Sequence, residues 1–203
     1  MIKIENVDVH GVARAIYSAR NAMNSWDKSD SRFETDTMGE NDLKLAKQLV
    51  KAGTDHAKFM RMITVTLDIT APMYWWKEFD TYKVATVRNS CSTMHTIHKK
   101  EFTLDDFSYE HLDLELKILE VVIISLNAAR KRYLKSKDKA DWWQIIQLLP
   151  SSYNQRSTVQ LNYAVLRNIY HSRKNHKLDE WRDFCKWIEE LPCSELITME
   201  GSE

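Results

Sequence analysis

The chain has 203 residues, with 29 basic and 29 acidic side chains and a formal net charge of zero. This length favours one domain with a full hydrophobic core, and the balanced charge gives no reason to expect nucleic acid or an anionic membrane as the main partner. No apolar run reaches the ~20 residues that a membrane-spanning helix needs. The three cysteines lack metal-site spacing and the N-terminal residues lack a signal-peptide core, so we expect a cytoplasmic protein without a metal site.

The first forty residues predict a strand, a helix and a loop. Apolar side chains alternate over Lys3–Val9, which predicts a short strand ended by Gly11. Apolar residues then recur at spacings of three and four over Val12–Trp26, which predicts a helix. The polar segment 27–41 has neither pattern. We expect it to be a mobile loop, either a lid over a site or a plain surface insertion, and the second reading is favoured.

The next part of the chain predicts a helix, a strand and an aromatic helix. The second helix begins at Asn41 or Asp42, which are good capping residues, and ends before Gly53. The run Met62–Ile69 resembles a β-strand. Pro72 then opens a helix rich in aromatic residues, at a position where the missing N–H costs little.

The second half of the chain is expected to be mainly helical. The longest helix is predicted over Tyr109–Leu134, and its run Val121–Ile124 is apolar on every side, which is typical of a central helix or of a contact between subunits. Residues 198–203 are expected to be a frayed tail. Further elements are predicted at Ala140–Leu149, Ser157–Tyr163, Ala164–His171 and Leu178–Leu191. About six helices and three or four short strands give an α+β fold, predicted as a single domain over residues 1–203.

One candidate binding segment is Thr86–Thr93, which is small and polar and contains neither Gly nor Pro. Such a segment between two apolar blocks suits the wall of a pocket that holds a polar ligand. An exposed connector is an equally good interpretation of the composition.

A second candidate group lies around the predicted helix that begins at Ala164. Asn162 comes just before its start, and Asn168 and Arg173 fall near its end. Amides and a guanidinium together can bind the edge of a heterocycle and an oxyanion. The alternative is that Asn162 only caps the helix and Arg173 is a solvated surface cation. On composition alone this alternative is favoured.

The order of these segments resembles that of the flavin-dependent thymidylate synthases. The likeness covers roughly Val7 to Ile188. It consists of an Ala-Arg pair after the first helix, a Leu-x-x-x-Gly-x-x-His turn, a strand leading to Ala-Pro, and a Leu-Pro pair followed at the family's spacing by Asn, Asn and Arg. In these places the chain has, in order, Ala19-Arg20, Leu49, Gly53 and His56, Ala71-Pro72, and Leu149-Pro150 with Asn162, Asn168 and Arg173.

The chain departs from the family at its signature, Arg-His-Arg-x-x-Ser-x-Asn-Glu-x-Ser-x-Arg-Tyr. Thr81 and Tyr82 replace the first Arg and the His, Ser90 and Met94 replace the Glu and a later Arg, and Ile146 replaces an Arg before the Leu-Pro pair. In the family these arginines hold the nucleotide. A hydrogen bond to a charged group contributes about 1.5–3 kcal/mol, so their loss weakens dUMP binding by several powers of ten. With one residue inserted near Arg88, the matching positions are Lys83, Thr86, Asn89 and Ser92.

The resemblance implies a fold that is helix-rich with a small antiparallel sheet, and a homotetramer that uses FAD and a folate to methylate dUMP. It implies that Arg173 is catalytic, because it polarises the pyrimidine base. The cofactor-binding residues that it implies are His56, Asn162 and Asn168. The nucleotide-binding residues that it implies are Lys83, Thr86, Asn89, Ser92 and Arg173.

Three functions remain open at this point. The first is a divergent flavin-dependent enzyme that alkylates C5 of a deoxyuridylate-like substrate. The second is a catalytically inactive relative that holds or sequesters a nucleotide, with Trp75, Trp76 and Tyr82 as new aromatic residues able to stack a base. The third is a structural assembly protein with an empty pocket. The first two are equally favoured.

Overall fold

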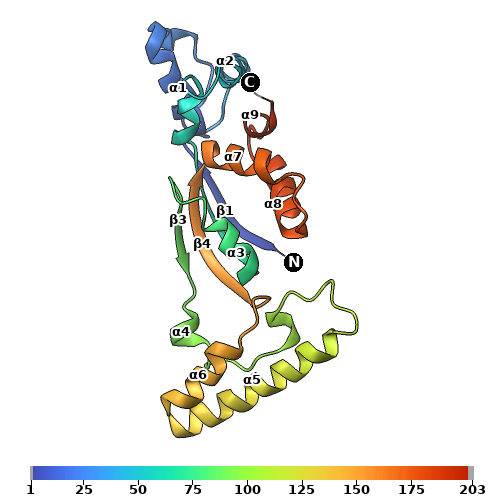
Figure 1. Ribbon diagram of the computed structural model, residues 1–203. Coiled ribbons are helices and arrows are strands. Elements are labelled where there is room, and N and C mark those ends of the chain that lie inside the picture. The colour runs from blue at the N-terminus through green and yellow to red at the C-terminus, as the bar shows by residue number, and fades with distance from the viewer. Residues whose placement is uncertain (1, 201–203) are drawn as a thin grey trace. The chain divides into compact units, whose positions relative to one another are not determined.

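The computed structural model describes residues 2–200 (Figure 1). Where the sequence predicts a single domain, the contacts within the chain divide it into two compact units. The first unit consists mainly of Ile69–Thr81 and Asn89–Ser157. The second contains Ile4–Asp68, Tyr82–Arg88 and the segment that begins at Thr158. The chain therefore enters each unit more than once.

Four strands form one antiparallel sheet in the order β1-β2-β4-β3. The strands are β1 (Lys3–His10), β2 (Thr64–Pro72), β3 (Val87–Ser90) and β4 (Asn154–Asn162). Buried and more accessible residues alternate along β2 and along the second half of β4, as expected for strands with one face against the core. The α+β class with a small antiparallel sheet is therefore confirmed.

The second unit holds the N-terminal and C-terminal helices. Val12–Trp26 is not one helix, because α1 ends at Ala19 and the chain continues as a 3-10 turn that stops where Asn24 adopts a left-handed conformation, with φ of 47°. Gly53 follows the second helix as predicted, with φ of 105°. The helical segments of this unit are α1 (Val12–Ala19), η1 (Arg20–Met23), η2 (Trp26–Lys28), α2 (Glu40–Lys51), η3 (Ala57–Met62), α7 (Tyr163–Arg173), α8 (Asp179–Glu189) and α9 (Glu195–Thr198).

Segment 27–41 is joined to the start of α1 by hydrogen bonds. The Asp36 carboxylate accepts hydrogen bonds from the backbone N–H groups of Gly11 and Ala13, at 2.6 and 2.9 Å. A β-bridge between Arg32 and Thr37 closes the turn that carries this carboxylate. The loop thus supplies the cap of α1, whose own capping position is a glycine without a side chain.

Replacing Asp36 with alanine is expected to lower the free energy of unfolding by about 1–2 kcal/mol, the usual effect of losing a helix cap. The measurement is urea denaturation followed by circular dichroism. Glu34→Ala is the matched control, because Glu34 is an exposed acid in the same loop. Equal midpoints for the two variants would show that the cap contributes nothing.

The C-terminal residues are tied to α7. The Nη1 group of Arg167 donates hydrogen bonds to the carbonyl oxygens of Leu196, Ile197 and Met199 at 3.2, 3.0 and 2.6 Å. A frayed tail is predicted for 198–203, but Thr198 ends α9 and Met199 is held by this arginine. The remainder of that prediction, 201–203, lies outside the described residues.

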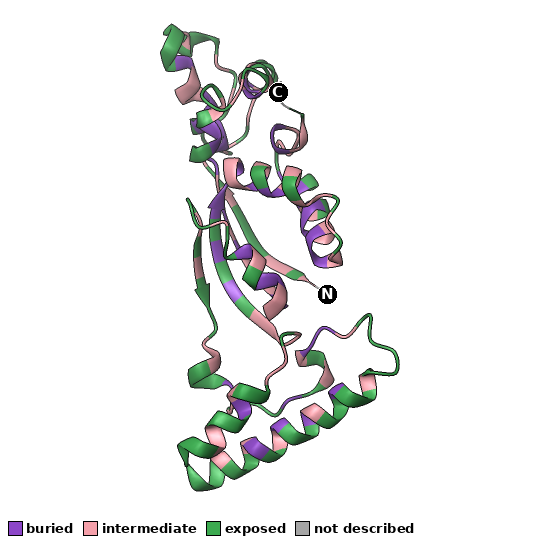
Figure 2. Ribbon diagram, viewed as in Figure 1, coloured by how far each residue is buried: buried purple, intermediate pink, exposed green. Residues whose placement is uncertain are grey.

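The first unit contains α3 (Met73–Phe79), α4 (Thr93–Thr96), η4 (Leu104–Asp106), α5 (Leu116–Ser136) and α6 (Lys139–Leu148). One side of α5 packs against α6 and a cluster of buried residues. Its opposite side is exposed, with Ile118, Val121 and Ile124 at 65, 60 and 68% exposure (Figure 2). Within the first unit, α5 is therefore buried along one side and exposed along the other.

Candidate functional site

Helix α7 carries three of the predicted site residues. Asn162 immediately precedes it, is only 7% exposed, and accepts a hydrogen bond through Oδ1 from the Val165 N–H at 3.0 Å. Its oxygen is therefore the N-terminal cap of α7. Asn168, two turns further along, is exposed, and its Oδ1 accepts a hydrogen bond from the Ser172 hydroxyl at 3.4 Å.

Arg173 is the last residue of α7 and is half-buried. Its Nε donates a hydrogen bond to the Tyr82 hydroxyl at 2.9 Å, and its guanidinium carbon lies 5.0 Å from the centre of the Trp181 ring. A guanidinium within about 6 Å of an aromatic ring is attracted to the ring's negative face. Arg173 is therefore held in a defined place and is not a solvated surface cation.

Tyr82 links α7 to the segment that carries two further predicted residues. Lys83 follows it and is exposed, so its ammonium group is accessible to an anion. The chain then turns at Ala85, which has φ of 59°. The buried hydroxyl oxygen of Thr86 has no hydrogen-bond partner among the described residues. A buried hydroxyl without a partner is costly, and such groups often mark a place where a ligand or water binds.

Asn89 and Ser92 belong to the other compact unit. Asn89 is an exposed residue of β3. The Ser92 hydroxyl accepts a hydrogen bond from the His95 N–H at 3.2 Å and so caps α4. The polar segment at Thr86–Thr93 is therefore partly a strand and partly a helix start, which explains its small polar side chains in structural terms.

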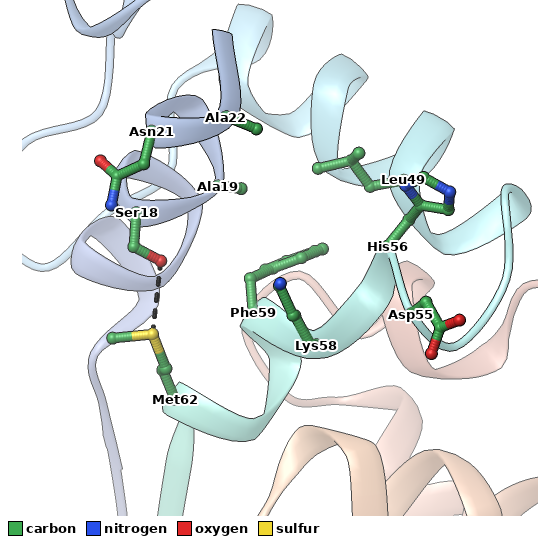
Figure 3. A pocket seen from close by; sticks show the side chains of 10 residues that line it. All are labelled: Ser18, Ala19, Asn21, Ala22, Leu49, Asp55, His56, Lys58, Phe59 and Met62. Atoms are coloured by element: carbon green, nitrogen blue, oxygen red, sulfur yellow. Dashed lines mark hydrogen bonds between the residues drawn. The ribbon is translucent and has the colours of Figure 1, made fainter. Parts of the chain in front are cut away.

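His56 lines a cavity of about 960 Å³ in the second unit (Figure 3). One wall comes from α1 and η1 and the other from the end of α2 and from η3. Half of the lining is apolar, and polar groups are contributed mainly from one side by Asp55, His56 and Lys58. The lining residues are Ser18, Ala19, Asn21, Ala22, Leu49, Asp55, His56, Lys58, Phe59 and Met62.

The lining of this cavity suits a flat heterocycle that carries an anionic group. Phe59 is 3% exposed and forms a rigid apolar floor, while Lys58 and His56 are exposed polar groups beside it. Ligand sites of this size usually combine an apolar surface with a few polar groups that fix orientation. Neither Asn162 nor Asn168 is among its lining residues. His56, a predicted site residue, lies in this lining, and Lys58, which the sequence analysis does not single out, lies beside it.

Trp75 and Trp76 do not present faces that could stack a base, so that expectation is wrong for these two residues. They are 0 and 2% exposed. Trp75 stacks on Phe79 with ring centres 5.0 Å apart, and the Trp76 indole donates a hydrogen bond to the Gln155 carbonyl at 2.9 Å. The aromatic richness of α3 builds the core. Within residues 2–200, no group of three His, Cys, Asp or Glu side chains is placed to hold a metal ion, and no helix is long and apolar enough to cross a membrane.

The fold and the order of its elements can be compared with those of known proteins. No protein-family model matches the sequence, and comparison with curated proteins gives no significant match. Comparison of structures, however, shows that the chain has the fold of the flavin-dependent thymidylate synthases along almost its whole length. The fold expected from the sequence is confirmed.

Three solved structures illustrate the likeness. Two are of the flavin-dependent thymidylate synthase ThyX from Helicobacter pylori with FAD and dUMP, at 17 and 16% sequence identity and TM-scores of 0.72 and 0.73; in each comparison 98% of this chain and 98% of that chain are covered. The third is the UMP/dUMP methylase PolB from Streptomyces cacaoi bound with 5-Br dUMP, at 13% identity and a TM-score of 0.65. That match covers 100% of this chain and 97% of the methylase.

Proposed function

We propose that the protein binds a pyrimidine nucleotide of the dUMP class and a flavin, and alkylates C5 of the pyrimidine. The observation that carries this proposal is the fixed position of Arg173 at the end of α7, with its guanidinium against Tyr82 and Trp181. The structurally similar ThyX and PolB proteins bind dUMP or its bromo analogue, and the two ThyX structures also contain FAD. The fold likeness supports the ligand class and does not by itself assign the chemistry.

The chain's own residues supply the groups that such a nucleotide needs. Arg173 donates to a carbonyl oxygen of the base and so draws electron density from the ring, as a charge-assisted hydrogen bond does. Lys83 supplies an accessible positive charge for the phosphate, and the partnerless hydroxyl of Thr86 supplies a donor or an acceptor. Asn89 and Ser92 are further candidates for this role on the resemblance alone.

The cavity beside His56 fits a flavin in size and lining. His56 and Lys58 would hold polar and anionic parts of the cofactor, and Phe59 would contact the ring. When bound, the flavin would supply the hydride equivalent, and a folate that carries a one-carbon group, the co-substrate that the resemblance implies, would supply the carbon added at C5. Asn162 and Asn168 remain cofactor-binding candidates on the resemblance, each through the side-chain amide nitrogen, since the Asn162 oxygen caps α7 and the Asn168 oxygen accepts from Ser172.

Nucleotide binding without chemistry is the second candidate. It is favoured by the changes at the signature motif of the resembling family, where Thr81 and Tyr82 replace an arginine and a histidine. Tyr82 also uses its hydroxyl on Arg173. A site with fewer positive charges holds a nucleotide less tightly and polarises it less.

Spectroscopy and calorimetry of the purified protein separate these functions. The proposal expects a flavin absorption band, or uptake of FAD on titration, together with a binding isotherm for dUMP. It also expects C5 alkylation of dUMP when a reductant and a folate that carries a one-carbon group are supplied. Binding of dUMP without flavin uptake or turnover would favour the second candidate. A colourless protein that binds neither ligand would contradict both.

Filling the cavity is expected to abolish flavin uptake. Ala22 is an exposed residue of η1 at the cavity wall, so Ala22→Trp places a large ring in the cavity without disturbing the core. FAD affinity is measured by fluorescence quenching. Ala140→Trp is the matched control, because it adds the same ring at an exposed position of α6. Undiminished FAD binding by Ala22→Trp would show that the flavin lies elsewhere.

We also propose that the protein forms a homotetramer, as the resemblance implies, and that the exposed side of α5 contacts a second copy. Ile118, Val121 and Ile124 form an apolar strip on this side. The exposed charges near its start are mainly acidic, and those near its end are basic, so two antiparallel copies of α5 bring opposite charges together. The acidic residues are Asp113, Glu115 and Glu120, beside the single basic Lys117. The basic residues are Lys131, Arg132 and Lys135, of which Lys131 and Arg132 also pair with Glu101 and Asp141 of the same chain.

Charge within this strip is expected to prevent assembly. Val121→Glu combined with Ile124→Glu is expected to shift the protein to a smaller species in light scattering coupled to size-exclusion chromatography, because burying unpaired carboxylates is strongly unfavourable. Met23→Glu is the control, since Met23 is 80% exposed on η1. An unchanged mass for the double variant would exclude this side of α5 as the contact.

The reducing cytosol remains the expected setting. Cys91, Cys185 and Cys193 are all free thiols, and none is placed in a disulfide. Burial raises the pKa of Cys185 to about 12 and that of Cys193 to about 11, so both thiols are unreactive near neutral pH.

A further inference from the structure

The guanidinium of Arg173 is enclosed by two aromatic side chains from different parts of the chain. Trp181 comes from α8, is fully buried, and lies with its ring centre 5.0 Å from the guanidinium carbon. Tyr82 comes from the segment before β3, and its ring centre is 5.7 Å from the same carbon. The two rings also contact each other, with centres 6.0 Å apart at an angle of 66°.

Trp181 acts as an immobile platform. Its ring packs edge to face with Phe184 and with His176, at 6.1 and 6.3 Å between ring centres. A side chain with no exposed surface and aromatic neighbours on several sides is closely packed and has little room to move. The Trp181 ring therefore sets the surface against which the guanidinium lies.

The Tyr82 hydroxyl holds one edge of the guanidinium. It accepts a hydrogen bond from Nε of Arg173 at 2.9 Å. Because the guanidinium group is planar, a contact at Nε combined with the aromatic platform defines the directions in which the two terminal amino groups donate. The hydroxyl itself is uncharged, so it orients Arg173 without neutralising it.

We propose that Tyr82 is a positioning residue that orients Arg173 for the pyrimidine carbonyl. This inference rests on the proposed function, in which Arg173 binds the base. Tyr82 stands where the resembling family has a histidine, so the acceptor for Nε in this chain is a phenol, which does not become a cation. This acceptor therefore gains no positive charge on acidification, whereas an imidazole in the same place would.

The first test measures dUMP affinity by isothermal titration calorimetry in three variants. Tyr82→Phe retains the ring and removes the hydroxyl, and is expected to weaken binding by roughly 2- to 10-fold, the effect of one lost hydrogen bond. Tyr170→Phe is the matched control: the Tyr170 hydroxyl, also on α7, bonds to Glu189 at 2.8 Å and is expected not to affect dUMP binding.

Tyr82→His gives a measurement, the pH dependence of dUMP affinity, that would not change if Tyr82 had only a structural role. A neutral imidazole accepts the Nε hydrogen bond, whereas an imidazolium repels Arg173. The ratio of variant to wild-type affinity is therefore expected to fall as the pH is lowered through about 6.5, the ordinary pKa of histidine. Taking the ratio removes the titration of the nucleotide phosphate, which is the same in both measurements.

The second test needs no nucleotide. In ¹⁵N-arginine-labelled protein, the Nε–H signal that Arg173→Lys removes is expected to exchange slowly with water in the wild type and rapidly in Tyr82→Phe. Slow exchange that persists in Tyr82→Phe overturns the inference, as does normal dUMP affinity in that variant while the wild type binds dUMP. Failure of the wild type to bind dUMP at all overturns the proposed function together with this inference.

Discussion

Replacing Asp42 with alanine is expected to lower the free energy of unfolding by about 3–5 kcal/mol, the cost of breaking a buried ion pair from one side. Asp42 has no exposed surface, and its Oδ1 accepts a hydrogen bond from Nε of Arg20 at 2.7 Å. Its Oδ2 accepts hydrogen bonds from the hydroxyls of Ser29 and Ser31 at 2.6 and 2.5 Å. The variant leaves the guanidinium of Arg20, itself only 6% exposed, buried without its carboxylate.

The same contacts predict how stability depends on pH. Burial alone would raise the pKa of Asp42, but the hydrogen bonds from Ser29, Ser31 and Arg20 together with the charge of Arg20 outweigh it and lower the pKa. A carboxyl group whose pKa is lower in the folded state stabilises the protein above its unfolded pKa, and this contribution is lost as the pH falls through the folded pKa. We therefore expect the wild type to lose stability below about pH 4.

Urea denaturation at pH 7 and at pH 3 measures both effects. Asp105→Ala is the control, because Asp105 is exposed and its loss is expected to change stability by less than about 0.5 kcal/mol. Asp42→Asn is expected to be destabilised at pH 7 and to lose less further stability at pH 3 than the wild type does. If Asp42→Asn loses as much stability between pH 7 and pH 3 as the wild type does, the Asp42 carboxyl group is not the cause of that loss.

The Arg20–Asp42 network also shows what a sequence pattern cannot predict. Asp42 is a predicted helix-start residue, and it does lie in the first turn of α2. Its partners, however, lie 11 to 22 residues earlier in the chain: Ser29 and Ser31 in a segment whose composition predicts a loop, and Arg20 in the predicted first helix. Local periodicity identified the helix, whereas the ion pair depends on how two distant turns fold together.

Predictions from local pattern succeeded where one period dominates. The alternation in β2 and the three- and four-residue spacing in α7 and α8 follow from which face is buried, so each element was predicted within a few residues. Residue type alone did not distinguish a buried aromatic from one that lies beside the candidate site. Trp75 packs in the core while Tyr82, seven residues later, contacts Arg173.

Helix α5 marks a different limit. Its run of four apolar residues predicts burial on every side, but within its own compact unit the buried residues of α5 lie on the side that carries Leu119, Ile123 and Leu126. An apolar pattern predicts that a side chain is buried, but it does not indicate which part of which molecule covers it. The site residues have the same limit, because Asn162 and Ser92 match a binding motif and are also the caps that α7 and α4 require.

Replacing Arg173 with alanine is expected to weaken dUMP binding by roughly 10- to 150-fold, which corresponds to losing about 1.5–3 kcal/mol for a hydrogen bond to a charged group. Arg173→Lys is expected to recover little of this loss. A lysine retains the charge, but an ammonium group cannot lie flat against Trp181 while donating to Tyr82 in the fixed directions of a guanidinium.

The neighbouring cation provides the control for this measurement. Lys174 pairs with Glu200 at 2.8 Å and carries the same charge one residue further on, so Lys174→Ala removes a positive charge without touching the Tyr82–Trp181 contact. If binding depends on net charge alone, Lys174→Ala and Arg173→Ala will weaken it equally, and Arg173→Lys will restore it. If binding depends on an oriented guanidinium, only the two Arg173 variants will lose affinity for dUMP. Adding salt to the wild type will then not cause a loss of the same size, because salt screens charge and does not change the geometry of the contact.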